Sequence, residues 1–231
     1  MKTTFFKIML LCFGMAFTLS SCSLDDGDNN TVNVPNVAYG LIANASPASG
    51  DLSFYADLNK INTTPLNYTN VAGYYPFNLG ERVLSVKNSR GETLTTKTVT
   101  LTGGESFSAF AVNTFNNIEL VTYKDSLVYP AANHARVRFI NLSPDTPSVD
   151  IKGPTQNFAT NLTFKQSTEF MEVQSGSYDI NFLEAGTTTS LHQSTAVQFT
   201  AGRIYTIYTK GFRAPATGSN DTFSAEQMRN Y

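Results

Sequence analysis

The sequence has 231 residues, and 16 Lys and Arg stand against 18 Asp and Glu, so the formal net charge is −2. This balance provides neither a basic patch for nucleic acid nor a polyacidic tail, and we expect no nucleic-acid partner. Thr, Asn, Ser, Val, Phe and Tyr are abundant, Trp is absent, and runs of helix-forming residues are few. Such a composition favours β-strands over helices.

Residues 1–21 have the layout of a secretory signal. Lys2 and Lys7 come first, and an almost wholly apolar or small run follows from Ile8 to Leu19. A membrane-spanning helix needs about 20 apolar residues, so this run is too short to serve as a permanent anchor. We therefore expect a cleaved signal peptide.

The end of this segment, Leu19-Ser20-Ser21-Cys22, resembles the lipobox of bacterial lipoproteins. The resemblance implies cleavage between Ser21 and Cys22 and a membrane anchor of acyl chains on Cys22. Each buried methylene contributes about 0.8 kcal/mol, so two or three chains hold a protein firmly. The only other cysteine, Cys12, lies in the removed segment, which leaves Cys22 without a disulfide partner. An ordinary signal peptide with a chance cysteine is the alternative.

Residues 22–34 form the next segment, which is too polar to bury and predicts a flexible tether. Ser23 directly after the cysteine resembles the sorting pattern for the outer membrane. The acids Asp25, Asp26 and Asp28 resemble the surface-export signal of Bacteroidetes lipoproteins, although a solvated spacer explains them equally well. The periplasmic face and the cell surface both remain open.

An internal repeat organises the rest of the chain. Residues 38–47 align without a gap with residues 135–144, and residues 80–86 align with residues 176–182. The repeat predicts two tandem units, at 35–130 and 131–213, followed by a tail at 214–231. Within the tail we expect at most a frayed turn near residues 224–228.

Within each unit, apolar and polar residues alternate over short runs, which indicates strands. In the second unit, Val137 and Phe139 are expected to face the core while Arg136 and Arg138 face water. Residues 118–123 are expected to close the first unit. The pattern predicts an all-β fold of two antiparallel β-sandwiches, immunoglobulin-like or transthyretin-like.

Residues 135–151, which read ARVRFINLSPDTPSVDI, resemble the opening of the domain of unknown function 4397. Residues 175–178 and 201–207 resemble the later strands of that family, and the first unit resembles it as a weaker copy. The resemblance implies a tandem, all-β, exported protein of the Bacteroidetes lipoprotein type. It supplies no established activity and no catalytic residues.

The sequence offers little for catalysis or metal binding. His134 and His192 are far apart and are expected to be surface histidines, so we expect no metal and no cofactor. A carboxylate pair could come from any two of Asp145, Asp150, Glu169, Glu172 and Asp179. Asp150 and Asp179 alternate with apolar residues, which favours a solvated strand face for both. No Gly-x-Ser-x-Gly elbow and no phosphate loop is present.

Three further features are candidates for structure or contact. Tyr74, Tyr75 and Phe77 form the most aromatic cluster and suggest a contact patch for a ligand, with core packing as the alternative. Asn-x-Ser-Pro occurs at residues 44–47 and 141–144, where it predicts the end of a strand and a turn. Ser126, within Asp-Ser-Leu, resembles an O-glycosylation site of Bacteroidetes.

These observations favour a non-enzymatic envelope lipoprotein whose β-sandwiches bind a protein or a glycan. A fimbrillin-like or other assembly subunit of a surface structure is the alternative, and an accessory enzyme of glycan breakdown comes third. The ligand, the oligomeric state and the orientation of the two units are not given by the sequence.

Overall fold

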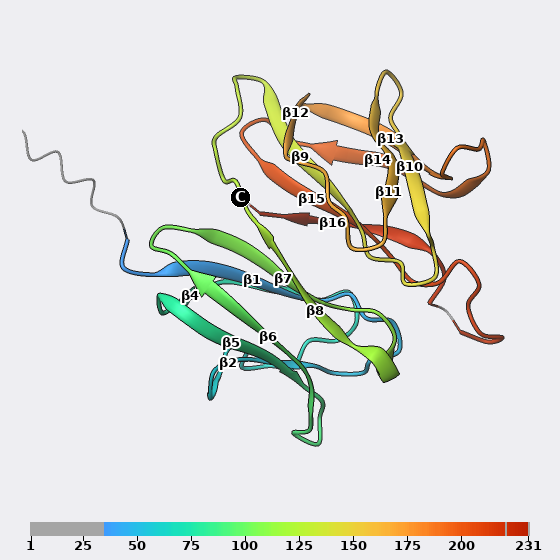
Figure 1. Cartoon of the computed structure of the whole chain (residues 1–231). Coiled ribbons are helices and arrows are strands. Elements are labelled where there is room, and N and C mark those ends of the chain that lie inside the picture. Colours follow the sequence, from blue (N-terminus) through green and yellow to red (C-terminus); the bar gives the residue numbers. More distant parts are fainter. Residues whose placement is uncertain (1–34, 220, 231) are drawn as a thin grey trace, which may run out of the picture. The chain divides into compact units, whose positions relative to one another are not determined.

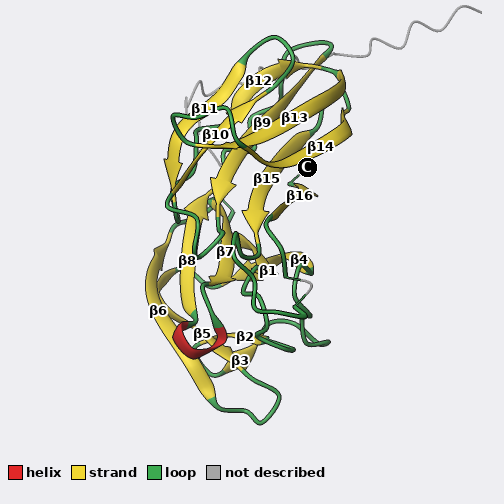
Figure 2. Ribbon diagram, turned by 90° about the vertical axis from the view of Figure 1, so that its right-hand side faces the viewer, coloured by secondary structure: helices red, strands yellow, loops and turns green. Residues whose placement is uncertain are grey.

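The structure, a computed structural model, describes residues 35–219 and 221–230. Cys22, Ser21, the signal peptide and the tether lie outside the described residues. The described part is all-β, as predicted, with a single 3-10 turn (Figures 1 and 2). The first unit contains β1 (Ala38–Asn44), β2 (Ser53–Ala56), β3 (Asn59–Lys60), β4 (Val71–Phe77), β5 (Gly80–Lys87), β6 (Thr93–Leu101), β7 (Ser106–Val112), the 3-10 turn Phe115–Asn117 and β8 (Glu119–Lys124). The second contains β9 (His134–Asn141), β10 (Ser148–Lys152), β11 (Asn157–Thr163), β12 (Met171–Gln174), β13 (Gly176–Glu184), β14 (Ser190–Phe199), β15 (Ile204–Lys210) and β16 (Ser224–Arg229).

The two units have the same topology. The sheets of the first unit have the strand orders β4-β1-β7-β8 and β3-β2-β5-β6, and those of the second have the orders β12-β9-β15-β16 and β11-β10-β13-β14. Each strand of one unit thus has a counterpart eight strands later, which agrees with the sequence repeat. The two β-sandwich units predicted from strand alternation are confirmed.

The sheets are not wholly antiparallel. β1 pairs with β7 in parallel, and β9 pairs with β15 in parallel, in the middle of their sheets. Between β1 and β7 the chain passes through the opposite sheet, so it returns in the same direction instead of turning back through a hairpin.

Each unit has its own apolar core between its sheets. Phe77 and Phe107 pack edge to face in the first unit, with their ring centroids 5.1 Å apart. Phe139 and Phe158 pack at 4.8 Å in the second. The predicted turn after the first strand is confirmed in both units: the side-chain oxygen of Asn44 accepts a bond from the backbone of Ser46, and that of Asn141 accepts one from Ser143.

The central strands bury both of their faces, which the alternation did not predict. A third apolar cluster joins the units and consists of Leu41, Ala43, Ala45, Phe110, Val112, Ile140, Leu142, Tyr208 and Met228. Phe110 and Tyr208 meet across it with ring centroids 5.3 Å apart. The expectation that Arg138 faces water is therefore wrong: its side chain is 2% exposed, because the outer face of β9 packs against the first unit. Arg136 is half-buried.

The predicted loose tail is also wrong over part of its length. β16 pairs with β15 along six residues, from Lys210 opposite Ser224 to Tyr205 opposite Arg229. Met228 and Asn230 are buried. The sequence of β16, SAEQMR, has too few apolar residues to show a strand period, and its neighbours supply the burial that fixes it.

Candidate functional site

The structure separates the aromatic residues predicted to form a contact patch. Phe77 is buried in the first core, and Tyr75 packs against the same core. Tyr74 points the other way, toward the second unit, and its hydroxyl bonds to Asp125 of the first unit and to Asn230 of the second. Successive residues of β4 take opposite faces, so Tyr74, Tyr75 and Phe77 do not form one patch.

Ser126 lies half-buried just after β8. Its carbonyl accepts a hydrogen bond from the guanidinium of Arg136 at 3.2 Å. Its neighbour in the Asp-Ser-Leu motif, Asp125, is 5% exposed. Glycosylation of Ser126 stays a prediction.

Two of the candidate carboxylates, Asp150 and Asp179, lie in different surroundings. Asp150 is 7% exposed, so the solvated face expected for it is wrong, whereas Asp179 is exposed as expected. The carboxylate of Asp150 accepts the backbone N–H groups of Asn161 and Gly186 at 2.8 and 3.0 Å. The bond from Asn161 lowers the pKa of Asp150, burial opposes this, and the bond from Gly186 lowers it further. Its role is to satisfy backbone at a β-bulge.

His192 lies beside a hydroxyl group of its own strand. Its Nε2 is 3.1 Å from Ser194 Oγ, and burial lowers the pKa of the imidazole. Among the described residues no carboxylate bonds to His192, so a Ser-His-Asp arrangement is not assembled. The same residues hold no group of three potential metal ligands and no helix long and apolar enough to cross a membrane.

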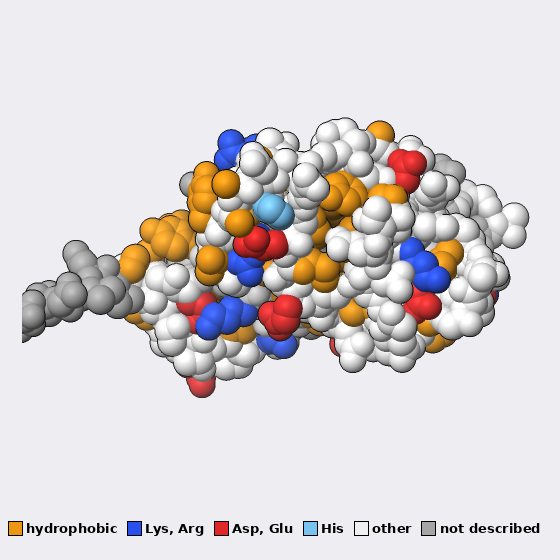
Figure 3. All heavy atoms as spheres, turned by 90° about the horizontal axis from the view of Figure 1, so that it is seen from above, with side chains coloured by type: hydrophobic (Ala, Val, Ile, Leu, Met, Phe, Trp, Pro, Cys, Tyr) orange, Lys and Arg blue, Asp and Glu red, His pale blue; other side chains and the backbone are white. Residues whose placement is uncertain are grey.

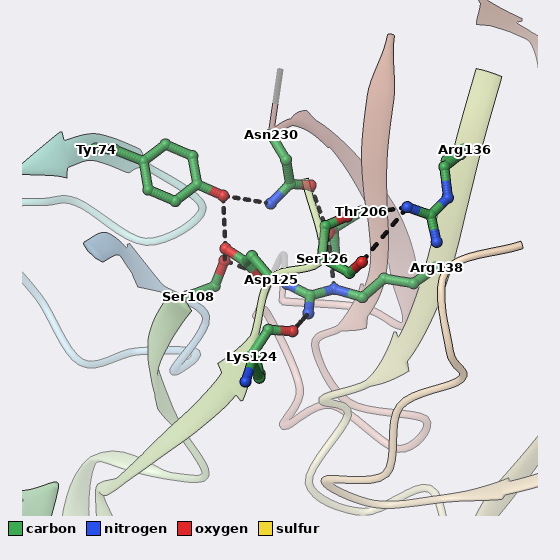
Figure 4. Close-up of polar contacts among 9 residues, drawn as sticks. All are labelled: Tyr74, Ser108, Lys124, Asp125, Ser126, Arg136, Arg138, Thr206 and Asn230. Carbon is green, nitrogen blue, oxygen red and sulfur yellow. Dashed lines mark hydrogen bonds and ion pairs between the residues drawn. The ribbon is translucent and has the colours of Figure 1, made fainter. Parts of the chain in front are cut away.

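The most extensive buried polar group of the described residues lies between the two units (Figure 4). Arg138 of β9 forms an ion pair with Asp125, with Nη2 2.5 Å from Oδ1 but without hydrogen-bond alignment. Arg138 also donates to Ser108, to the carbonyl of Lys124 and to Thr206. Both charged side chains are almost fully buried.

These contacts close into a ring through hydroxyl and amide groups. Asp125 Oδ2 accepts from Ser108 at 2.7 Å and from Tyr74 at 2.5 Å. The hydroxyl of Tyr74 accepts from Asn230 at 2.9 Å, and Asn230 accepts from Thr206 at 2.7 Å. Burial raises the pKa of Tyr74, which keeps its hydroxyl protonated as a donor. We call Tyr74, Ser108, Asp125, Arg138, Thr206 and Asn230 the polar ring.

The polar ring joins the units and is not exposed for binding. Three members belong to the first unit and three to the second, and five of the six are at most 5% exposed: Ser108, Asp125, Arg138, Thr206 and Asn230. A buried ion pair satisfied in this way specifies one arrangement of its neighbours, because any displacement leaves a charge unpaired.

An open hollow lies beside this junction. It has a volume of about 600 Å³ and is lined by residues 64–66 and 69–73 of the first unit and by residues 227–229 of β16. Asn70 and Arg229 are exposed there, and the carbonyl of Thr69 accepts a bond from Tyr208 across the junction at 3.3 Å. We call this hollow the inter-unit groove. Its size is that of a small-ligand site.

The remaining surface has mixed charge. On the face seen in Figure 3, acidic and basic side chains are interspersed, with apolar atoms between them.

The fold defines a protein of two tandem β-sandwiches joined through a buried polar ring. Residues 38–152 match the family model described as "Domain of unknown function (DUF4397)", which supports the resemblance to that domain. The match covers β1 to β10, that is, the whole first unit and the first two strands of the second. It includes residues 135–151, on which the resemblance was mainly based, but it does not reach residues 175–178 and 201–207. The first unit, which the sequence presented as the weaker copy, is thus matched over its whole length.

Other comparisons add little. No curated protein sequence matches the chain. One solved structure, titled "Alpha-glucan binding by a streptococcal virulence factor", is similar at 9% identity over 74% of this chain and 92% of the other, with a TM-score of 0.25. A likeness at that TM-score carries no argument about this protein.

Proposed function

We propose that the chain is a lipid-anchored envelope protein of the Bacteroidetes type, and that its two β-sandwich units act as a non-enzymatic binding module. The lipobox Leu19–Cys22 and the polar segment after it support the anchor. The tandem arrangement of two sandwiches with a groove between them supports a binding role. The location is the outer membrane, on its periplasmic face or at the cell surface.

The inter-unit groove is the observation that carries the binding role. Neither unit forms it alone, since its walls come from β16 and from residues 64–73. The polar ring keeps those walls in place without occupying the groove. Asn70 and Arg229 offer amide and guanidinium donors to a ligand rich in oxygen acceptors, such as a glycan or an extended peptide.

The anchor is tested by feeding cells a palmitate analogue and following the mature protein on gels. The wild-type chain should incorporate the label, and Cys22→Ala should lose both the label and membrane association. An unlabelled wild type, or a Cys22→Ala variant labelled as strongly as wild type, would remove the anchor from the proposal.

Binding is tested with the mature chain on glycan arrays and against envelope extracts. If the groove is the site, Asn70→Ala and Arg229→Ala should each weaken whatever binding is found, whereas Arg203→Ala, an exposed arginine outside the groove, should leave it unchanged. Removing one good hydrogen bond to a ligand costs about 0.5–1.5 kcal/mol, or roughly 2- to 12-fold in Kd. No partner at all, or equal loss in all three variants, would contradict the assignment.

Assembly into a surface structure is a second candidate, favoured by one observation. The edge strands β6 and β8 leave a hollow of about 350 Å³ between the sheets of the first unit, lined by residues 97–101 and 122–124. Its counterpart in the second unit, between β14 and β16, has about 130 Å³ and is bridged by Gln227, which donates to the carbonyl of Gln198. An added strand from another chain would fit the open edge of the first unit. Polymer ladders on gels of gently solubilised envelopes would support this candidate, and monomer alone would exclude it.

A further inference from the structure

Most of the large exposed apolar side chains of the described residues lie at one end of the first unit or in the loop between β8 and β9. The large ones are Tyr39, Leu58, Val83, Phe115, Val128 and Tyr129, and Leu58 is the most exposed, at 95%. Hydrophobic atoms also collect at the left-hand end of the face in Figure 3, the side on which β1 begins in Figure 1. Scattered apolar residues are normal on a protein surface, so their concentration is what needs explaining.

Strand register shows that they share an end. Tyr39 lies opposite Ser106, the first residue of β7, and Phe107 lies opposite Lys124, the last residue of β8. The start of β1 is therefore level with the end of β8. Leu58 belongs to the turn after β2, which reaches the same level because the backbone of Asp57 bonds to Val83 near the start of β5.

Val128 extends this end toward the second unit. It lines a hollow with residues 102–105, the loop before β7, and with Ser106 of β7. Its carbonyl accepts a bond from Arg136 near the start of β9. Phe115 is the exception. It lies between the end of β7 and the start of β8, at the opposite end of the first unit. We call the end at which β1 and β9 begin the N-proximal end.

The length of chain before Pro35 indicates what this end meets. Thirteen peptide bonds join Cys22 to Pro35, the first described residue. Whatever conformation they take, they span at most about 45 Å. A lipid on Cys22 would thus keep the bilayer surface within that distance of the N-proximal end, at an effective concentration of about the millimolar range. At that effective concentration, a few weak apolar contacts are enough to hold this end against the bilayer.

The arrangement fits a flat surface better than a protein partner. Leu58 lies on one loop and Val128 and Tyr129 on another, whereas a stable protein interface buries about 800 Å² of contiguous surface on each side. The charge at this end is mixed, so apolar contact carries the interaction. Tyrosine and aliphatic side chains are suited to the interface between headgroups and acyl chains. Charged residues of both signs lie at this end: exposed Asp57, Lys60, Glu81, Lys124, Glu172 and Arg203, together with half-buried Arg82 and Glu105.

We infer that the N-proximal end rests on the lipid bilayer, with the loops of Leu58 and Val128 inserted among the headgroups. The inference rests on the proposed lipid anchor. It leaves the loops at the other end, including the 3-10 turn at Phe115, directed away from the membrane.

Single-tryptophan fluorescence tests this, because the chain has no Trp. The lipidated variants Leu58→Trp and Val128→Trp, with Phe115→Trp as the matched control, are reconstituted in phosphatidylethanolamine–phosphatidylglycerol vesicles with or without brominated acyl chains. All three positions are on the surface, and thermal unfolding checks that each variant folds like wild type. Bromine should quench the tryptophans introduced at positions 58 and 128 several-fold more than the one introduced at position 115.

Equal quenching at the three positions, or none, overturns the inference. Emission at position 58 or 128 that shifts with protein concentration in unbrominated vesicles would mean self-association at this end and would overturn it as well. Flotation of the same samples tests the lipid anchor independently of the quenching. A chain that floats with vesicles but shows no selective quenching keeps its anchor and loses the resting surface, while one that does not float has lost the anchor.

Discussion

Replacing Arg138 with methionine tests the central claim about the junction, that a buried ion pair holds the two units together. The substitution keeps much of the side-chain volume, so the main change is electrostatic. It leaves Asp125 buried without its countercharge, and it leaves Thr206, Ser108 and the carbonyl of Lys124 each without one donor.

Removing one partner of a buried ion pair costs about 3–5 kcal/mol. With an m-value of about 2 kcal/mol/M in urea, that loss lowers the unfolding midpoint by about 2 M. The assay is equilibrium unfolding of the mature chain in urea, followed by far-UV circular dichroism and tyrosine fluorescence. Coincident transitions with the two probes would show that the units unfold together.

Two further variants decide what the loss means. Arg203→Met removes an exposed arginine and should change stability by less than about 0.5 kcal/mol. Arg138→Met combined with Asp125→Leu leaves no buried charge, so it should recover part of the loss, although Tyr74 and Ser108 then lack their acceptor. A loss below about 1 kcal/mol for Arg138→Met, or a double variant as unstable as the sum of the singles, would refute the reasoning.

Three other predictions concern the units themselves. In Gly40→Ala the new methyl group would overlap the rings of Phe77 and Phe107, so thermal unfolding should show a loss of stability of about 1–3 kcal/mol. Adding Phe107→Leu should recover part of this stability, and no recovery would point to backbone strain instead. The lowered pKa of Asp150 gives stability that is complete above the ordinary Asp pKa of about 4 and is lost as the pH falls through the lowered value. Asp150→Asn should therefore be less stable than wild type at pH 7, with a gap that narrows below about pH 4, and a constant gap would be evidence against the carboxylate. Truncation after Arg213 removes β16 and should abolish cooperative unfolding of the second unit in calorimetry, whereas an unchanged transition would mean that the strand is dispensable.

The sequence predicted the strands correctly where only one face of the sheet is buried. Alternation identified the strands that line the two cores, and the repeat placed equivalent strands in both units. The Asn-x-Ser-Pro turns followed from the ability of an asparagine side chain to bond to backbone two residues on. Residues 118–123 were placed correctly as the closing strand, β8.

The junction between the units was not predicted, because apolar and polar residues were assumed to alternate between a buried and a solvent-exposed face of each sheet. Arg138 was expected to face water, yet Phe139 and Ile140 follow as two adjacent apolar residues, and residues 41–43 are apolar without a break. Uninterrupted apolar residues in a strand mean that both faces are covered. That signal was available, but its partner surface comes from another unit and is not local in the sequence.

The polar ring could not have been assembled from the sequence. Tyr74 and Asn230 are 156 residues apart, and nothing in the segment around either residue points to the other. The same holds for the inter-unit groove, whose walls come from a loop of the first unit and from a strand that the sequence presented as a tail.

The central position of β1 has a mechanical consequence. Any force that reaches the body through its N-terminal end arrives at this strand, which has β4 on one side and β7 on the other. Pulling along β1 loads both ladders in shear, so that many hydrogen bonds must break together, whereas an edge strand would peel away one bond at a time. When the N-terminus is pulled, β1 is therefore not the first strand expected to detach.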